Sequence, residues 1–288
     1  MQIAIALIVL FIFGIFIYTW YEFRSKLKLH IDLKNPKLDK DLKLIKKYLK
    51  TSDGLKIASW YLPVKNPKAV VILIDGYKEL DEDKTRNTIS HAQYLKNAGY
   101  SSILIDLRSF GESNGKKITF GVNEWKDAEA AYDFVKSQPE NKNKKIGFLG
   151  LSMGGVTSIA TKEETQKGDF IIASAPYASF KNLFDFRIRK RGLPAFIFLP
   201  FLKVAAAFEL GFDYEKYSAL NMIKKIDVPI LITSAKKDLR VNPNDAKTLY
   251  DAANKPKEYW EANTSHRIFK DNPREFQKKI LDFLAKYV

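Results

Sequence analysis

The chain has no cysteine among its 288 residues and only three histidines, His30, His91 and His266. Without a thiol it can form no disulfide and use no cysteine nucleophile, and a zinc site built on thiolates is excluded. The histidines form no His-x-x-x-His pair, so the sequence predicts no metal site and no cofactor. The scarcity of histidine also limits the choice of a catalytic base to three positions.

The most informative stretch that is present is a Gly-x-Ser-x-Gly pentapeptide at 150–154. It follows an apolar segment with strand composition (145–149) and precedes small and apolar residues typical of a buried helix (155–160). A serine on such a sharp strand-to-helix turn points outward, and its flanking glycines avoid clashes with neighbouring backbone. The helix N-terminus adds free N–H groups that favour developing negative charge. Ser152 is therefore predicted to be a nucleophile.

Position favours His266 as the base that would activate this serine. It lies in a short polar loop after an extended segment (257–261) and before a C-terminal amphipathic helix. His91 falls in a helix-like stretch, where either a surface position or packing explains it, and His30 lies in a Lys-rich run. A loop histidine without a catalytic task is the alternative interpretation of His266.

An orienting acid is expected at the carboxyl end of a strand between the serine and the histidine. Asp238 follows the apolar run 229–234, and α/β sheets place catalytic side chains at that end of a strand. Its carboxylate would accept a hydrogen bond from one imidazole nitrogen and stabilise the imidazolium. Asp245 is the alternative acid, although its place in the first turn of the next helix favours a role as an N-terminal charge.

The order Ser152, Asp238, His266 is that of the α/β-hydrolase superfamily, and most of residues 40 to 288 resemble it. The resemblance is carried further by three stretches: 69–76, 102–113 and 121–127. The first two resemble a strand with its oxyanion-hole turn and the next strand with its Asp-x-Arg loop. The third resembles a helix start of the membrane-anchored and prolyl-oligopeptidase-like branches.

By that resemblance, the oxyanion hole would be formed by the backbone N–H groups of Tyr77 and Met153. The chain departs from the superfamily pattern at Asp75, where histidine is common, and at Ser109, where glycine is common. A carboxylate beside an oxyanion hole would oppose the developing charge unless Lys78 or an arginine neutralised it.

The N-terminal segment 1–21 contains no charged side chain and is rich in Ile, Leu, Val and Phe. About 21 residues at roughly 1.5 Å each span the hydrocarbon core of a bilayer, so the segment is predicted to be a transmembrane anchor. Aromatic residues close it, and basic residues begin the following linker (22–40). A signal peptide or a buried core helix is the alternative. Because basic residues lie only after the span, the positive-inside rule predicts a cytoplasmic catalytic domain.

Residues 41–288 are long enough for one α/β domain. Alternating strand and helix patterns predict the α/β-hydrolase fold, with a mostly parallel central sheet and helices on both faces. The predicted strands centre on Val71, Leu104, Gly147, Ile171, Leu231 and Tyr259, and the predicted helices are 85–98, 122–137, 153–163, 244–253 and 272–286.

The alternation breaks at about 177–226, where a helical lid insertion is expected. Its apolar run 194–210 beside basic residues suits an acyl chain or a membrane surface, and ordinary helical packing over the sheet is the alternative.

The sequence therefore predicts a single-pass membrane serine hydrolase that cleaves an ester, thioester or related acyl bond of a small-molecule or lipid substrate through an acyl-enzyme. A serine peptidase of the prolyl-oligopeptidase-like branch and a non-catalytic binding protein are the alternatives. Although the formal net charge is +15, the lysines are scattered, which favours a solvated or lipid-facing surface over nucleic-acid binding. The pattern leaves the oligomeric state open.

Overall fold

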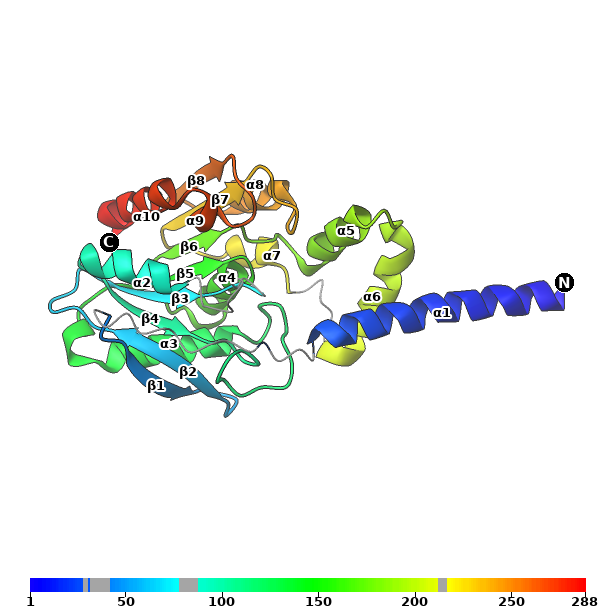
Figure 1. The fold of residues 1–288 in the computed structure, drawn as a ribbon, viewed down its shortest axis with the longest axis horizontal. Helices are drawn as coiled ribbons and strands as arrows, with labels where there is room; N and C mark the ends of the chain where they lie inside the picture. Colours follow the sequence, from blue (N-terminus) through cyan, green and yellow to red (C-terminus); the bar gives the residue numbers. More distant parts are fainter. Residues whose placement is uncertain (28–30, 32–41, 78–87, 212–216) are drawn as a thin grey trace.

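The structure, a computed structural model, describes residues 1–27, 31, 42–77, 88–211 and 217–288. Its centre is an eight-stranded sheet in the order β1-β2-β4-β3-β5-β6-β7-β8 (Figure 1). The strands are β1 Ile45–Lys50, β2 Lys56–Leu62, β3 Val70–Ile74, β4 Ser101–Ile105, β5 Ile146–Leu151, β6 Ile171–Ser174, β7 Ile230–Ala235 and β8 Lys257–Ala262. β2 pairs antiparallel with β1 and with β4, and from β4 to β8 every pairing is parallel. All six predicted strands are confirmed.

The parallel strands are short apolar runs because helices cover both of their faces. Every residue of β3, β4 and β5 is buried, and side chains of β3 alternate between two separate hydrophobic clusters. Helices α3, α4 and α8 pack on one face, and α2 and α10 pack on the other. The bounds of these helices are α2 Thr88–Asn97, α3 Trp125–Ser137, α4 Met153–Thr165, α8 Pro243–Ala252 and α10 Pro273–Tyr287; the short helices are η1 Pro139–Asn141 and α9 Ile268–Asp271.

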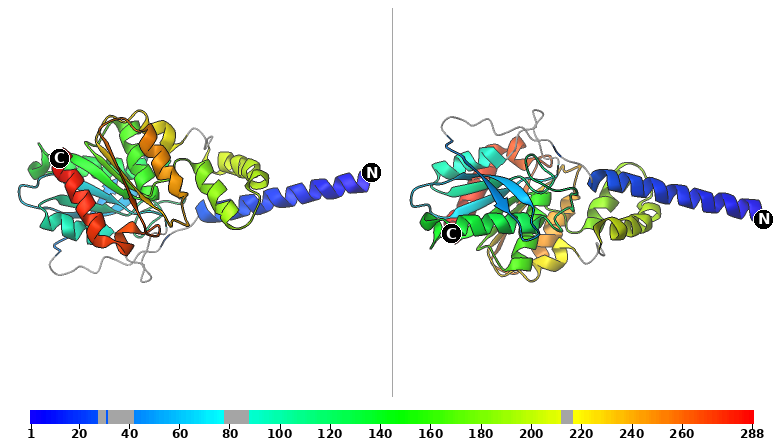
Figure 2. Two further views of the ribbon diagram at one scale, coloured as in Figure 1. Left: turned by 90° about the horizontal axis from the view of Figure 1, so that it is seen from above. Right: turned by 90° about the horizontal axis from the view of Figure 1, so that it is seen from below.

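The expected insertion consists of α5 Phe180–Lys190, α6 Ala195–Leu210 and α7 Ala219–Ile223. Ser179 caps α5 by accepting a hydrogen bond from the backbone of Asn182 at 3.1 Å. Figures 1 and 2 show α5 and α6 away from the sheet, beside the N-terminal helix α1 (Gln2–Leu27), whose far end projects from the molecule.

α1 is long and apolar enough to cross a membrane, and only 6% of its most apolar stretch is buried. A signal sequence near the N-terminus would have the same length and composition. The helix does not end at Tyr21, because it continues through the first residues of the expected linker to Leu27. Phe23 and Leu27 are buried in the hydrophobic core, which explains the extension. The predicted boundary at residue 40 lies outside the described residues.

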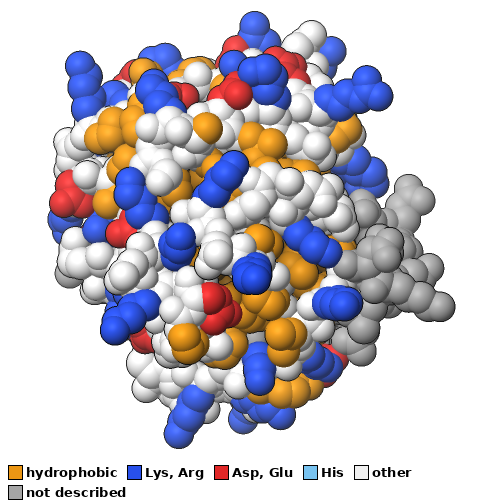
Figure 3. Space-filling model, turned by 90° about the vertical axis from the view of Figure 1, so that its left-hand side faces the viewer, with side chains coloured by type: hydrophobic (Ala, Val, Ile, Leu, Met, Phe, Trp, Pro, Cys, Tyr) orange, Lys and Arg blue, Asp and Glu red, His pale blue; other side chains and the backbone are white. Residues whose placement is uncertain are grey.

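Basic side chains are spread over the surface. Figure 3 shows the end of the molecule opposite α1, where Lys and Arg side chains stand apart from one another with hydrophobic side chains between them. On that face the positive charge is dispersed and does not form a single stripe.

Candidate active site

Ser152 occupies the turn between β5 and α4, with backbone angles φ 53° and ψ −113°. A positive φ is strained for a residue with a side chain, and such strain is concentrated at functional sites. The turn is fixed by a hydrogen bond from the backbone N–H of Ser152 to the carbonyl of Ser174 at 2.7 Å. The serine is nearly enclosed, with an exposed fraction of 8%. This geometry is that of a nucleophile elbow.

The glycines around Ser152 are required because backbone segments touch there. A Cβ on Gly150 would lie 2.1 Å from the carbonyl oxygen of Gly154, and a Cβ on Gly154 would lie 2.2 Å from that of Ile74. Contacts this short are not tolerated, so both glycines of the pentapeptide are needed for α4 to start directly over β3 and β5. A Cβ on Gly155 would lie 3.3 Å from its nearest neighbour, which leaves that position less restricted.

Asp238 and His266 meet at the carboxyl end of the same sheet. Asp238 follows β7, His266 follows β8, and the His266 Nδ1 lies 2.5 Å from the Asp238 Oδ2. The other carboxylate oxygen accepts hydrogen bonds from the backbone N–H groups of Arg240 and Val241, at 2.7 and 3.0 Å. Both residues are buried, Asp238 at 4% and His266 at 6% exposure. The carboxylate is therefore held in place by its own loop and orients the imidazole.

The alternative acid and the other histidines lie elsewhere. Asp245 is in the first turn of α8 and accepts hydrogen bonds from the backbone of Ala178 and the side chain of Asn182, at 3.1 and 3.3 Å. Burial raises the pKa of Asp245 despite those bonds. His91 is buried against Tyr94, Phe269 and Phe276, so of its two expected positions it takes the packed one and not the surface one. His30 lies outside the described residues.

The expected oxyanion donors follow two neighbouring strands. Tyr77 comes just after β3, and Met153 is the first residue of α4, directly after Ser152. Asp75, which departs from the superfamily pattern, directs its Oδ2 to the hydroxyl of Thr88 at the start of α2, at 3.0 Å. A carboxylate at a helix N-terminus is favoured by the helix dipole. Lys78 lies outside the described residues.

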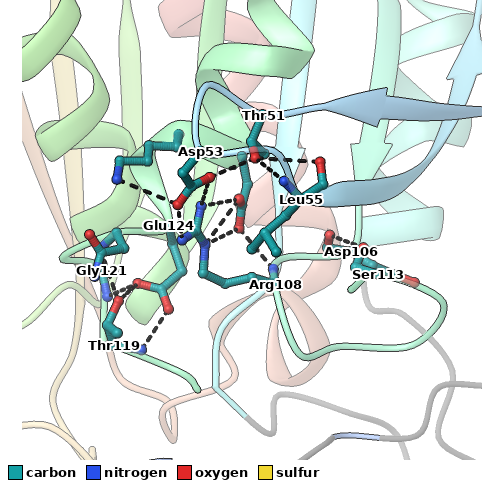
Figure 4. A network of polar contacts seen from close by, with 12 residues as sticks. Thr51, Asp53, Leu55, Asp106, Arg108, Ser113, Thr119, Gly121 and Glu124 are labelled. Atoms are coloured by element: carbon teal, nitrogen blue, oxygen red, sulfur yellow. Dashed lines mark hydrogen bonds and ion pairs between the residues drawn. The ribbon is translucent and has the colours of Figure 1, made fainter. Parts of the chain in front are cut away.

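A buried polar network supports the loop beside this turn (Figure 4). Arg108 bridges Asp127, at 2.8 Å, and Asp53, at 2.9 Å. Burial alone would lower the pKa of Arg108, but the attraction of the Asp127 carboxylate has the larger effect and raises it. The guanidinium therefore stays charged. Arg108 and Asp127 both lie in stretches that resemble the superfamily, but the sequence alone does not reveal that they pair.

Glu124 holds the same loop from the other side. Its carboxylate accepts hydrogen bonds from the backbone N–H groups of Thr119 and Gly121, at 2.7 and 2.8 Å, and from the Thr119 hydroxyl at 2.7 Å (Figure 4). These bonds place Phe120, whose ring packs 5.1 Å from that of Tyr77. The network therefore holds Phe120 against Tyr77, a predicted oxyanion donor. The sequence did not indicate this role for Glu124.

A cation from the insertion also reaches this region. Arg187 of α5 donates a hydrogen bond from Nε to the carbonyl of Arg240, in the loop of Asp238, at 3.2 Å. Burial raises the pKa of Tyr77, and the nearby Arg187 guanidinium opposes that rise. Within the part of the chain that the structure describes, no group of three or more potential metal-binding side chains is found.

The sheet order, the strained serine turn and the Asp–His pair at the strand ends define an α/β-hydrolase. The sequence profile of the X-Pro dipeptidyl-peptidase (S15 family) matches residues 53–206, more than half of the chain, and the chain belongs to that family. It is also 27% identical to the uncharacterized protein YqkD of Bacillus subtilis over 239 residues, which cover 80% of this chain and 76% of YqkD.

Solved structures share the fold. The esterase Pf2001 of Pyrococcus furiosus superposes with a TM-score of 0.75 at 21% identity, covering 91% of this chain and 98% of the esterase. The dipeptidyl peptidase 4 of Porphyromonas gingivalis superposes with a TM-score of 0.66 at 20% identity, covering 88% of this chain and 38% of the peptidase. Esterases and peptidases therefore use this architecture, and the recognised superfamily and fold class are confirmed.

Proposed function

We propose that the protein is a serine hydrolase in which Ser152 is the nucleophile, His266 the general base and Asp238 the acid that orients it. The observation that carries this proposal is the 2.5 Å contact between His266 and Asp238, on loops that leave the sheet at the same end as the strained turn of Ser152. A histidine paired through Nδ1 presents its Nε2 as the base, which is the tautomer that a serine nucleophile requires.

The chemistry follows from these roles. The Ser152 oxygen attacks the substrate carbonyl carbon while His266 takes its proton, and the backbone N–H groups of Tyr77 and Met153 stabilise the oxyanion. The tetrahedral intermediate expels the alcohol, thiol or amine, which leaves with the proton from His266. Water, deprotonated by His266, then attacks the acyl-serine, and the carboxylic acid is released as the proton passes from His266 to the Ser152 oxygen. No cofactor takes part in these steps.

We favour a hydrophobic or lipid-like ester or thioester as the substrate. The insertion reaches the loop of Asp238 through Arg187 of α5 and carries the apolar helix α6, and apolar surfaces favour acyl chains as ligands. A peptide substrate is the second candidate, because the chain belongs to a family of dipeptidyl peptidases. A p-nitrophenyl acyl ester series and an Xaa-Pro p-nitroanilide series, measured on the same preparation, distinguish the two candidates by their kcat/KM values.

The decisive control for this activity is a pair of serine variants. Ser152→Ala is expected to reduce hydrolysis by at least about a thousandfold, because the nucleophile is lost. Ser137→Ala is the matched control, since Ser137 lies at the exposed end of α3, where its hydroxyl donates to the carbonyl of Phe134 and accepts from the side chain of the neighbouring Gln138. Undiminished hydrolysis by Ser152→Ala, with folding retained, contradicts the proposal.

We also propose that α1 anchors the protein in a membrane as a single span, with the catalytic domain on the cytoplasmic side. The length and composition of α1 support the span, and the basic residues that follow it support the orientation.

A further inference from the structure

The exposed side of α6 carries an apolar stripe, which consists of Phe196, Pro200, Val204 and Phe208. These residues follow one another at intervals of four, so their side chains lie on one face of the helix. All four are exposed, Phe196 at 73% and Phe208 at 71%, while the other side of the helix contributes buried residues to the molecule. A continuous row of large, exposed apolar side chains indicates contact with an apolar partner.

The α6 stripe adjoins the apolar surface of α1. α6 packs against the C-terminal half of α1, where the ring of Phe201 lies 6.1 Å from that of Phe16 and the ring of Phe208 stacks on that of Trp20 at 5.4 Å. Figures 1 and 2 show this packing, with the N-terminal half of α1 projecting beyond α6. Phe208 belongs both to this contact and to the stripe, so the exposed apolar surfaces of the two helices meet there.

The length of α1 determines how deep α6 lies if α1 crosses a bilayer. Residues 2–14 of α1 are all exposed. At about 1.5 Å per residue this free part measures about 20 Å, whereas the hydrocarbon core of a bilayer is about 30 Å thick. The stretch without charged side chains continues to Tyr21, and its length of about 30 Å matches that thickness. Spanning therefore requires that the part of α1 between Phe16 and Trp20, which α6 contacts, also lies in hydrocarbon.

Paired charges lie just beyond this level and mark the boundary of the membrane. Glu22, the first charged side chain of α1, lies 3.7 Å from the guanidinium of Arg191, which follows α5. Glu209, in the last turn of α6, accepts hydrogen bonds from the indole of Trp20 and from the ammonium of Lys117, each at 3.0 Å. Tryptophan and charged side chains of this kind are typical of the interface between membrane and water.

Lys203 is the other charged residue of α6, and it is exposed beside the stripe. A lysine in such a place extends its ammonium to the lipid headgroups while its methylene stem stays in apolar surroundings. A helix with this charge suits the plane of the interface, where amphipathic helices are buried about 5–10 Å deep. That depth agrees with the level at which α6 contacts α1.

We infer that α6 is a second membrane-binding element, embedded in the near leaflet beside α1 with its stripe against the acyl chains. The partner of the stripe is thus lipid hydrocarbon. Because α5 contacts the loop of Asp238 through Arg187, an embedded α6 holds the candidate active site close to the membrane surface. The inference rests on the proposed membrane anchoring and does not depend on the proposed chemistry of Ser152.

Fluorescence quenching at single cysteines tests this inference, because the chain has no cysteine of its own. Phe196→Cys and Phe208→Cys place a probe on the stripe, and Phe11→Cys places one in the free part of α1. Lys278→Cys is the control, on an exposed position of α10 at the end of the molecule opposite α1 (Figure 1). The full chain is reconstituted in phosphatidylcholine vesicles that carry a nitroxide either near the start or near the end of an acyl chain, and iodide serves as the quencher in water.

We expect the nitroxide near the start of the chain to quench both stripe probes at least about twofold more than iodide does. The nitroxide near the chain end should quench Phe11→Cys most, and iodide alone should quench Lys278→Cys. Iodide quenching of the stripe probes as strong as that of Lys278→Cys overturns the inference. Stripe probes shielded from both iodide and lipid also overturn it, because protein, such as a second copy of the chain, then covers the stripe.

A carboxylate placed in the stripe supplies a second test. Val204→Glu, added to Phe196→Cys, should lower the lipid quenching of the probe at least about twofold, since a charge is costly in hydrocarbon. Ile45→Glu is the matched control, because Ile45 lies on β1 and has the same exposure as Val204, 43%. An equal effect of the two substitutions overturns the inference.

The same samples separate this inference from the proposed function. Lipid quenching of Phe11→Cys without lipid quenching of the stripe probes contradicts only the inference about α6. The absence of lipid quenching at Phe11→Cys and at the stripe contradicts the membrane anchor as well. Ester hydrolysis is measured in parallel, and its loss contradicts the proposed chemistry of Ser152 alone.

Discussion

At the scale of single residues, the carboxylate of Asp238 has a different task for each oxygen. One oxygen is held by two backbone N–H groups of its own loop, and the other meets His266. An amide in its place would keep the shape of the side chain but would present an N–H or a weaker acceptor to the imidazole. The orientation and the charge of the acid therefore matter independently of packing.

Asp238→Asn is accordingly expected to lower kcat for an acyl ester about a thousandfold or more while leaving the unfolding transition nearly unchanged. Steady-state hydrolysis and thermal unfolding in the same detergent measure the two effects. Asp251→Asn is the matched control on the exposed face of α8, where Asp251 pairs with Lys247. Equal activity of Asp238→Asn and the control would remove Asp238 from the mechanism.

His91 predicts a pH-dependent contribution to stability. Burial lowers its pKa to about 3, while an unfolded chain has a histidine pKa of about 6.5. Below about pH 6.5 the unfolded state therefore binds a proton at His91 that the folded state does not bind. The contribution of His91 to stability is fully present above about pH 6.5 and declines as the pH falls toward the pKa of the folded state.

Between about pH 7 and about pH 5, the wild type should lose about 2 kcal/mol more of its free energy of unfolding than His91→Phe. Phenylalanine retains the contacts with the surrounding aromatic rings and cannot take a proton. Denaturant unfolding at the two pH values makes the comparison. Parallel pH dependence in both proteins would show that His91 is not the group that titrates.

At the scale of elements, the close contact between α4 and β3 depends on the absence of a Cβ at Gly154. Gly154→Ala places a Cβ 2.2 Å from the carbonyl oxygen of Ile74, whereas Gly155→Ala places one 3.3 Å from Ala173. The first substitution should destabilise the protein by about 3 kcal/mol or more, and the second by about 1 kcal/mol or less. Denaturant unfolding of both variants tests the difference, and equal losses would contradict the close approach of α4 to the sheet.

Most of these elements could be predicted because their patterns are local. The apolar runs of β3 to β7, the helix periodicity and the glycine turn at Ser152 all lie within short windows of sequence. The order of Ser152, Asp238 and His266 added the superfamily. Of those three side chains, the structure places Asp238 and His266 in contact.

Features that depend on distant contacts could not be predicted. α1 continues to Leu27 because Phe23 packs against Phe180 and Phe184, which lie far away in the sequence. Glu209 is an acid in an apolar helix, and its partners, Trp20 and Lys117, come from two other parts of the chain. No local pattern contains such pairs, so the insertion was predicted as a lid but not as a companion of α1.

At the scale of the whole molecule, α1, α5 and α6 form one end and the hydrolase sheet the other (Figure 1). If α1 is a permanent anchor, the protein should remain in the pellet after alkaline carbonate extraction, and its intact mass should include the residues from the N-terminus of α1. A mature protein that begins after α1 would identify a cleaved signal sequence instead.

The most direct test of the account is the site of covalent modification by a fluorophosphonate, which reacts with an activated serine. We expect the full chain to be labelled on the peptide that contains Ser152, with labelling lost in Ser152→Ala and retained in Ser137→Ala. A well-folded wild type that is not labelled, or is labelled only on another serine, would contradict the assignment of Ser152 as the nucleophile.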